Sequence, residues 1–495
     1  LKQLCDDFFL SGVNRIMWHG TTYSPPDAPW PGWCFYASTE MNPRTALWHD
    51  APALNAYLTR VQSLLQSGRP DNDVLVYWPI HDLWRESDGG NRDLVKAITT
   101  DSREWFSEQP IGQTAGQLWL DGYAFDYVSD KLLQSARAAN RAIQLGESSY
   151  RAIVVPPCVS MPLQTMQKLR ELADAGVIVI FEDLVPRGVP GLHNLEKQQT
   201  DFHVAGSHFA ATSSAQIDFA IAKANVRREQ ALTSHEGVRY IRRAVKGGIV
   251  YFISNRGTKV LDEPIAFASP VHHAAILDPM TGRAGLAETT DGAVRLQLDP
   301  GETILVRTFE DALPANGASW KYRAVEGKPI ELEGTWTVKF VDGGPGFPKA
   351  IETSKLASWT TLGDGDTRRF AGTALYRLSF DAPDSVHTHR WLLNLGDVIQ
   401  SARVRLNGQD FGTVFAPPYR VEINGLKPKD NVLEIEVTGT SANRIRDLDT
   451  RGVKWKIFYD INMVNKAYKP FDAASWPIAD QGLLGPVTVQ AQATN

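Results

Sequence analysis

Side chains that could bind or cleave a sugar are concentrated near the start of the chain. Residues 18–48 hold four tryptophans, two tyrosines and five prolines, together with His19 and Glu40. Aromatic faces can stack on the C–H patches of a sugar ring, while imidazole and carboxyl groups can bond its hydroxyls. A proline-stiffened loop that packs as a small satellite core would have the same composition. The segment therefore predicts either a carbohydrate site or a structural loop.

Glycoside hydrolysis uses two carboxyl groups, one protonated to release the leaving oxygen and one ionised to activate water or attack carbon. Glu40 is the best candidate carboxylate, because its aromatic neighbours could desolvate it and raise its pKa. Its alternative role is to help cap the helix that follows, and Asp27 and Asp50 are weaker candidates. His19 could exchange hydrogen bonds with a sugar hydroxyl, or it could be a buried core histidine. The predicted substrate-binding set is His19, Tyr23, Trp30, Trp33 and Tyr36.

The elements around this segment are expected to alternate between helix and strand. Residues 1–10 have a helical stripe of apolar side chains, and Gly12 fits a helix C-terminal cap. Residues 13–18 are predicted to form a buried strand, and residues 51–68 a second amphipathic helix. In a (β/α)₈ barrel, the loops that follow the strands build the active site. A helix, a strand, an aromatic loop and a helix in this order fit the end of such a barrel, with His19 at the mouth of the strand.

Three runs in the first 80 residues carry a family resemblance: GVNRIMWHG, YSPPDAPWPGW and WHDAPALNAYLTRVQSLLQSGRPDNDVLVYWP. They resemble the final barrel strand, active-site loop and last helix of glycoside hydrolase family 106, the α-L-rhamnosidases. The resemblance continues to the C-terminus and implies hydrolysis of terminal α-L-rhamnose with inversion of the anomeric centre. Members of this family are much longer, and their catalytic glutamates lie on barrel strands that would precede Leu1. The chain is therefore expected to be a C-terminal fragment that lacks the main catalytic carboxylates and is inactive alone.

The resemblance also bears on cofactors and location. It implies a calcium ion in the complete enzyme, and calcium takes about six to eight oxygen ligands. No Asp/Asn-rich stretch suggests such a cage, so the sequence predicts no metal ligand and no cofactor in this chain. Family members are similar to periplasmic or secreted bacterial enzymes, although no leader is visible here. The alternatives are a non-catalytic carbohydrate-binding or scaffold protein and another glycosidase, such as a β-galactosidase.

Residues 71–233 are predicted to form an α/β domain. Apolar runs at 74–78, 127–128, 153–155 and 177–181 are typical of parallel strands buried on both faces. Pro162 should open a helix and Gly176 close it. This pattern resembles the flavodoxin-like, amidotransferase-type domain that follows the barrel in several glycosidase families. Cys158 follows two prolines and lacks the glycine-flanked turn of a nucleophile, so we expect a structural domain, whose residues 80–86 could line the barrel's pocket.

Two β-sandwiches are expected to follow. Apolar residues alternate or run together at 238–245, 249–253, 294–298 and 303–306, which predicts an antiparallel sandwich over 234–310. Residues 311–328 are a candidate linker. Within 329–495, the runs LNLGDV, RVRLNGQDFG and NVLEIEVTGTSANR resemble the jelly-roll sugar-binding domain of family 2 glycosidases. That domain could bind sugar or act as a scaffold. Residues 1–70 are assigned to the last part of the (β/α)₈ barrel.

Composition narrows the range of partners. A chain of 495 residues should hold several domains, and 43% hydrophobic with 22% charged residues is ordinary for globular protein. The net charge of −5 gives no basic footprint for nucleic acid, and no apolar run of about 18 residues suggests a membrane span. The three cysteines lack metal-site spacing, so we expect reduced, partly buried thiols. The expected partner is a rhamnose-containing glycoside.

Overall fold

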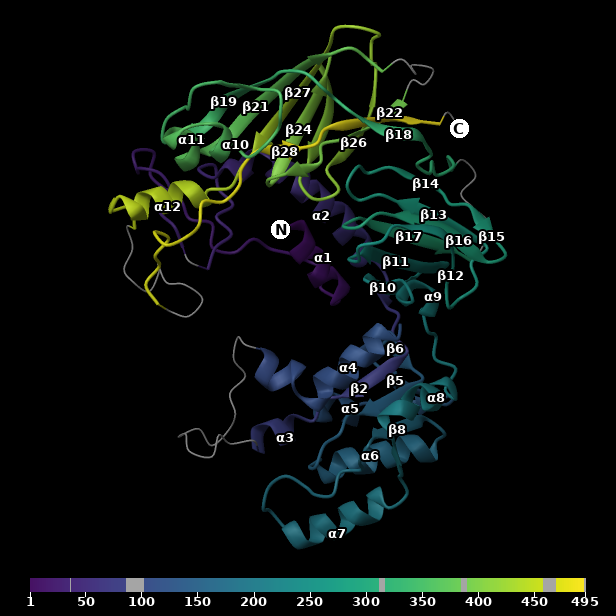
Figure 1. Cartoon of the computed structure of the whole chain (residues 1–495). Coiled ribbons are helices and arrows are strands. Elements are labelled where there is room, and N and C mark those ends of the chain that lie inside the picture. Colours follow the sequence, from purple (N-terminus) through teal and green to yellow (C-terminus); the bar gives the residue numbers. More distant parts are fainter. Residues whose placement is uncertain (36, 86–101, 311–316, 384–389, 457–468, 494–495) are drawn as a thin grey trace.

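The computed structural model describes residues 1–35, 37–85, 102–310, 317–383, 390–456 and 469–493. An α/β body lies at one end, a β-sandwich in the middle and a second β-sandwich at the other end (Figure 1). The first two helices lie at the centre, where they pack against the middle sandwich and reach the terminal one. This mixed architecture of helices and many sheets confirms the expected multidomain class.

The α/β body is built on a five-stranded parallel sheet in the order β3-β2-β7-β8-β9. The strands are β2 (Val74–Tyr77), β3 (Phe125–Val128), β7 (Ala152–Val155), β8 (Ile178–Glu182) and β9 (Ala211–Thr212). Leu75 and Tyr77 of β2 face one core, while Val74 and Val76 face another. Because both faces are covered, these strands have continuous apolar sequences. The strand order is that of flavodoxin-like doubly wound sheets, as predicted.

Helices and a small antiparallel sheet complete this body. The helices are α3 (Ile80–Arg85), the π-helical turn η2 (Arg103–Ser107), α4 (Pro110–Leu120), α5 (Asp130–Gln134), α6 (Leu163–Asp174), α7 (Leu195–Gly206), the short η3 (Ser214–Gln216), α8 (Ile217–Ala222) and α9 (Gln230–Thr233). The small sheet contains β4 (Arg137–Ala139), β5 (Ala142–Leu145) and β6 (Ser148–Tyr150). Pro162 directly precedes α6 and Gly176 follows it with φ +86°, as the sequence predicts.

The middle sandwich has a six-stranded sheet, in the order β1-β10-β11-β17-β13-β14, and a three-stranded sheet, β12-β16-β15. The strands are β1 (Arg69–Pro70), β10 (Val238–Val245), β11 (Gly248–Asn255), β12 (Leu261–Ala266), β13 (His273–Leu277), β14 (Ala284–Leu286), β15 (Thr289–Thr290), β16 (Ala293–Leu298) and β17 (Thr303–Phe309). Tyr251 and Ile253 of β11 lie in the core between the two sheets. Val250 and Phe252 lie in a different core, on the outer face of the larger sheet.

That outer face is covered by α1 (Lys2–Leu10) and α2 (Ala51–Leu65). Phe9 of α1 meets Phe252 edge-on, with ring centroids 5.7 Å apart. The Tyr57 hydroxyl of α2 is hydrogen-bonded to Thr303 at 3.0 Å and donates to Asp6. The first helices, assigned from the sequence to a separate barrel region over 1–70, therefore share a core with the middle sandwich.

Residues 13–18, predicted as a buried strand, form no strand in the structure. The segment runs along α2, because side chains of that helix bond its polar groups. Ile16 N donates to Gln62 Oε1 at 2.5 Å, and Trp18 Nε1 donates to Asn55 Oδ1 at 3.0 Å. Ile16 and Trp18 pack inward, while Met17 is 87% exposed. Since no strand among the described residues pairs with this segment, its apolar pattern reflects packing on the helices.

The terminal sandwich places the sheet β18-β29-β22-β26 against the sheet β20-β19-β21-β27-β24-β25 across a single core, with β23 and β28 as a separate pair. Its strands are β18 (Val325–Glu331), β19 (Trp336–Gly344), β20 (Ile351–Thr353), β21 (Ala371–Phe380), β22 (Arg390–Asn394), β23 (Asp397–Val398), β24 (Ser401–Leu406), β25 (Gln409–Val414), β26 (Arg420–Asn424), β27 (Asn431–Thr438), β28 (Leu483–Gly485) and β29 (Thr488–Gln492); its helices are α10 (Trp359–Leu362), α11 (Gly365–Arg369) and α12 (Ala442–Thr450). Asn407 and Gly408 have φ of 51° and 83°, as the two central residues of a type I′ turn require. β18 begins inside the stretch expected to be a linker.

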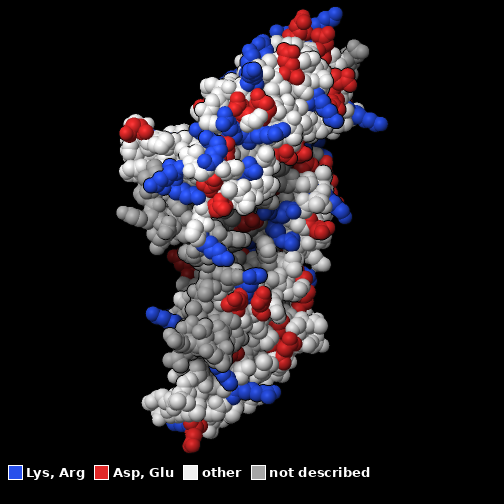
Figure 2. Space-filling model, turned by 60° about the vertical axis from the view of Figure 1, so that its left-hand side comes forward, with Lys and Arg blue, Asp and Glu red and all other residues white. Residues whose placement is uncertain are grey.

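Two surface properties bear on possible partners. No helix in the described ranges is long and apolar enough to cross a membrane. On the face shown in Figure 2, Lys and Arg side chains are interspersed with Asp and Glu.

Candidate functional site

The aromatic loop, residues 11–45, connects α1 to the short helix η1 (Ala46–His49), and its described residues form no helix or strand. Its shape depends on Arg44, which sequence reasoning did not single out. The Arg44 guanidinium donates to the carbonyl oxygens of Pro25 and Ala28, both at 2.6 Å. In return, Trp30 Nε1 donates to the Arg44 carbonyl at 3.0 Å. These bonds close the proline-rich turn, and the fixed φ of each proline limits the entropy lost on ordering.

Glu40 is the second polar centre of the aromatic loop. Its Oε1 accepts from Phe35 N at 2.8 Å, and its Oε2 accepts from Asn42 Nδ2 at 3.1 Å and Thr22 Oγ1 at 3.3 Å. Burial raises the pKa of Glu40, although these three hydrogen bonds oppose the shift. The helix-capping role expected as an alternative is wrong, because the carboxylate bonds the loop itself and α2 starts only at Ala51.

Three members of the predicted substrate-binding set are exposed on the loop. His19 is exposed and its ring meets Phe35 edge-on, with centroids 5.8 Å apart. This position rules out the buried core histidine that was the alternative. Tyr23 is 86% exposed and Trp33 is 38% exposed. Gly20, with φ +74°, lies so close to Phe35 that a Cβ would come within 2.6 Å of the ring, so the loop requires glycine there.

Trp30 lies in a different environment. The guanidinium of Arg444, from α12 of the terminal sandwich, sits 3.9 Å from the centre of the Trp30 ring. Burial lowers the pKa of Arg444 to about 10, against the opposing effect of Asp447. A cation in this position occupies one aromatic face, so Trp30 joins the loop to the terminal sandwich. Tyr36, the remaining member of the predicted set, lies outside the described residues.

Further contacts fix the end of the aromatic loop and the start of α2 to the terminal sandwich. His49 Nε2 lies 2.7 Å from Asp342 Oδ2. The buried Asp50 accepts from Ser401 Oγ at 2.6 Å through Oδ2. Asp50 Oδ1 and Arg403 Nε lie 3.7 Å apart, and neither has a hydrogen-bond partner among the described residues. Asp50 is thus an anchor between α2 and β24, which leaves it little freedom to act on a substrate.

Among the described residues of the α/β body, none has a hydrogen bond or ring contact with the aromatic loop. α3, which covers the residues expected to line the barrel's pocket, lies well away from the loop (Figure 1). Asp82 of this helix accepts from Ser160 N at 2.8 Å, which ties α3 to its own domain. Cys158 is buried, and desolvation together with the charges of Asp82 and Asp130 raises its pKa well above the usual range. A thiol so disfavoured as a thiolate supports the structural role predicted for it.

The other cysteines and the metal ligands can be placed as well. Cys5, Cys34 and Cys158 are free, as predicted, and burial raises the pKa of Cys5 to about 11 and that of Cys34 to about 12. In the part of the chain that the structure describes, no group of three or more His, Cys, Asp or Glu is arranged to hold a metal ion. Among these described side chains, no such group fits the calcium ion that the family resemblance implies.

Comparisons with known proteins show the family of this chain. The model of the family Glyco_hydro_106, described as alpha-L-rhamnosidase, matches residues 1–88 and 108–288, which is more than half of the chain. This chain belongs to glycoside hydrolase family 106. A structure of a rhamnosidase from Novosphingobium sp. PP1Y shares its fold, with a TM-score of 0.71 and 23% identity over 99% of this chain and 46% of that one.

One curated relative of this family 106 chain is named for a glycosidase other than a rhamnosidase. The "Putative beta-glucuronidase" of Formosa agariphila is 29% identical over 216 residues, which cover 39% of this chain and 18% of the relative. The chain thus spans less than half the length of either protein.

Proposed function

We propose that this chain supplies one wall of the substrate site of an α-L-rhamnosidase, which removes terminal α-L-rhamnose from glycosides or polysaccharides with inversion. The observation that carries the proposal is the preorganised aromatic loop inside the family match. Arg44 and Glu40 hold the loop from within, while His19, Tyr23 and Trp33 remain exposed. Such a surface suits a sugar, because aromatic faces cover its apolar patches and a few polar groups fix its orientation.

Each exposed residue has a defined part in this proposal. Tyr23 and Trp33 offer flat apolar faces to the rhamnose ring and its methyl group. His19 exchanges a hydrogen bond with a ring hydroxyl, because a neutral imidazole has one donor and one acceptor nitrogen. Glu40 acts as a positioning residue, since both of its oxygens already accept hydrogen bonds from the loop.

The acid and the base of the reaction are assigned to barrel units that this chain does not contain. In inverting enzymes, one carboxyl protonates the leaving oxygen and the other activates water, with about 6.5–9.5 Å between them. We propose that residues 1–70 are the last part of a (β/α)₈ barrel, and that the terminal sandwich is a jelly roll. Exposed apolar side chains at Leu4, Phe8 and Met17 support the barrel proposal, because they offer a surface for further units. By family resemblance, the enzyme works in the periplasm or outside the cell.

The direct test compares the 495-residue chain with the longest natural polypeptide that includes it. We expect the longer polypeptide to hydrolyse p-nitrophenyl α-L-rhamnoside in preference to the β-D-galactoside and the β-D-glucuronide. The 495-residue chain alone should give no turnover, because each missing proton transfer is worth about 10²–10⁴-fold. Turnover by the 495 residues alone would contradict the assignment of both carboxyls elsewhere. Preference for another glycoside would replace rhamnose as the substrate.

A further inference from the structure

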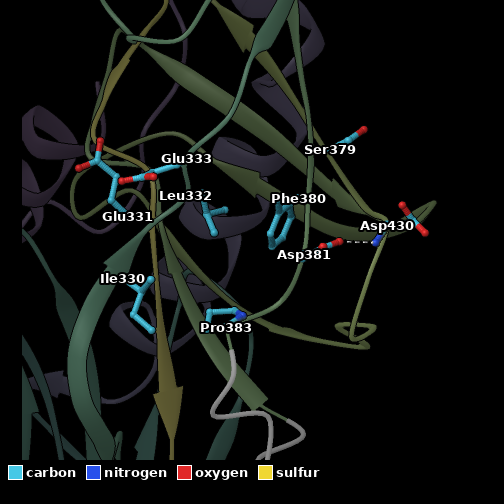
Figure 3. Close-up of a pocket in the computed structure, with 9 residues that line it drawn as sticks. All are labelled: Ile330, Glu331, Leu332, Glu333, Ser379, Phe380, Asp381, Pro383 and Asp430. Carbon is cyan, nitrogen blue, oxygen red and sulfur yellow. Dashed lines mark hydrogen bonds between the residues drawn. The ribbon is translucent and has the colours of Figure 1, made fainter.

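Two cavities border the terminal sandwich, and their chemistry differs. The first holds about 590 Å³ and opens between the ends of β18, β21 and β27 (Figure 3). Its carboxylates do not converge: Glu331 and Glu333 lie on one side of the cavity, and Asp381 and Asp430 on the other, with Leu332 and Phe380 between them. Acidic groups spread in this way define no binding point.

The second cavity, the inter-sandwich cavity, holds about 500 Å³ between the middle and terminal sandwiches. Its walls come from the β13–β14 turn, the β16–β17 turn, the stretch around Trp320 and the connection between β25 and β26. Gly301 marks where the two sandwiches touch, because a Cβ there would lie 2.8 Å from the Pro417 carbonyl oxygen. Cavities of this size at domain interfaces are common ligand sites.

The interior of the inter-sandwich cavity is polar but charge-balanced. Arg323 donates to Glu302 Oε1 at 2.8 Å, and Arg420 donates to the same oxygen at 2.8 Å. Asp299 accepts from both arginines. Burial alone would raise the pKa of Glu302, but the two guanidinium charges outweigh it and hold that pKa below its usual value. Each carboxylate is therefore paired with a guanidinium, which leaves no excess charge to attract an ionic ligand.

Hydrogen-bonding capacity nevertheless remains. Arg420 bonds its carboxylate partners through Nη2, so its Nη1 and Nε have no acceptor among the described residues. Arg283 bonds both oxygens of Glu422, at 3.0 and 3.1 Å, through Nη1 alone. Within the described structure, Arg420 and Arg283 thus have free N–H donors, and the paired carboxylate of Glu302 has free lone pairs. Vicinal hydroxyls of a sugar, which both donate and accept hydrogen bonds, can bond such groups.

An aromatic surface completes the inter-sandwich cavity. Trp320 lines it and packs against the core of the middle sandwich. The Arg283 guanidinium lies 5.3 Å from the Trp320 ring, and Phe411 contributes from the terminal sandwich. Aromatic rings beside planar polar groups match the two kinds of surface that a pyranose presents.

We propose that the inter-sandwich cavity is a second carbohydrate site, which binds a neutral sugar unit of a glycan chain. This proposal rests on the proposed function in one respect, because the glycan chain is taken to be part of the enzyme's substrate. A sugar held here would keep a polymeric substrate on the enzyme while its terminal residue occupies the aromatic loop. Binding at the cavity requires none of the catalytic groups, so it can be measured without turnover.

The test measures binding of rutinose, a neutral disaccharide, and of trigalacturonate, an acidic trisaccharide, by ligand-observed NMR with the 495-residue chain. A Tyr23→Ala, Trp33→Ala background removes the aromatic faces of the loop, so that the signal reports the cavity. Arg283→Ala and Trp320→Ala are introduced into this background. The matched control is Trp119→Ala. Trp119 is a surface tryptophan of the α/β body, and like Trp320 it has an arginine beside its ring, since Arg239 lies 5.1 Å from the ring centre.

We expect rutinose to bind and both cavity variants to weaken it at least tenfold, with the control unchanged. Arg283 is on the rim, so its variant should fold even if removal of Trp320 disturbs the core. No binding of rutinose to the background protein, or equal binding to the Arg283 variant, would overturn the proposal. Stronger binding of trigalacturonate would overturn the neutral-sugar assignment. Rhamnoside hydrolysis is scored separately, so loss of one conclusion leaves the other intact.

Discussion

Two of the junctions between the parts of this molecule are built differently. Where the α/β body meets the middle sandwich, Arg242 of β10 is fully buried and donates to Glu229 at 2.9 Å and to Asp73 at 2.8 Å. Arg227 pairs with Asp73 at 2.8 Å and with Asp71 at 2.7 Å. Glu229 also accepts from the Tyr251 hydroxyl at 3.1 Å. The carboxylates of this network are thus shared among several donors.

The second junction, between the aromatic loop and the terminal sandwich, is less complete. Asp50 and Arg403 each keep a buried polar atom without a hydrogen-bond partner among the described residues. Arg444 is half-buried against Trp30 and depends on an aromatic face. A fully paired buried network resists opening, because any displacement exposes an uncompensated charge. The incomplete junction adjoins the candidate substrate site, where some adjustment around a ligand is useful.

The largest expected effect is at the first junction. Arg242→Met should lower the free energy of unfolding of the middle sandwich by about 3–5 kcal/mol, because Asp73 and Glu229 lose their buried partner. Thermal unfolding followed by circular dichroism measures it. Arg295→Met is the control, because its pairs with Asp262 and Glu288 are exposed and worth less than about 1 kcal/mol. Equal losses in the two variants would mean that the buried network is no stronger than a surface pair.

A smaller loss is expected at the second junction. Asp50→Asn keeps an acceptor for Ser401 and leaves Arg403 with Glu436, 3.1 Å away. We therefore expect a cost of about 1–2 kcal/mol, measured by the same unfolding experiment. A cost as large as that of Arg242→Met would contradict the difference drawn between the junctions.

The smallest expected effect is that the contributions of Asp73 and Glu40 to stability change in opposite directions with pH. Burial would raise the pKa of Asp73, but the hydrogen bonds and charges of Arg227 and Arg242 outweigh it and lower that pKa. Asp73 therefore stabilises the fold above its unfolded pKa of about 3.9, and this contribution is lost as pH falls through the folded pKa. Glu40 has a raised pKa, so its contribution is present below about 4.3 and is lost as pH rises through the folded value.

Hydrogen exchange at stepped pH can separate the two responses. After correction for intrinsic rates, protection of the amides of β10 should fall as pH drops below about 4. Protection of the Phe35 amide, which donates to Glu40, should not fall over the same steps. Parallel loss of protection at both places would contradict the opposite signs of the two pKa shifts.

The sequence predicted best those strands whose pattern of apolar residues depends only on the sheet to which they belong. β10 has the predicted bounds, and the apolar residues Leu433, Ile435 and Val437, which alternate with polar ones in β27, face the core. The parallel strands β2, β7 and β8 also followed from their apolar runs, but the order of the strands in the sheet did not. The strand predicted over residues 13–18 was wrong, because the segment lies along α2 and pairs with no strand among the described residues.

The candidate site was predicted only in part. Exposure of His19 followed from its place after the apolar run. The roles of Arg44 and Arg444 could not be found, because one acts through backbone carbonyls and the other through a contact between residues far apart in the chain. Glu40 was singled out for its aromatic neighbours, but its hydrogen bonds to Thr22 and Asn42 depend on the fold of the loop.

The central claim is that the aromatic loop faces the substrate, and His19→Ala tests it most directly. In the longest natural polypeptide that includes this chain, the substitution should reduce kcat/KM for p-nitrophenyl α-L-rhamnoside by about 5- to 150-fold, through loss of one or two hydrogen bonds. Because His19 is exposed, Tm should hardly change. A Tm lowered by many degrees, with kcat/KM of the folded enzyme intact, would contradict the claim and make His19 a packing residue.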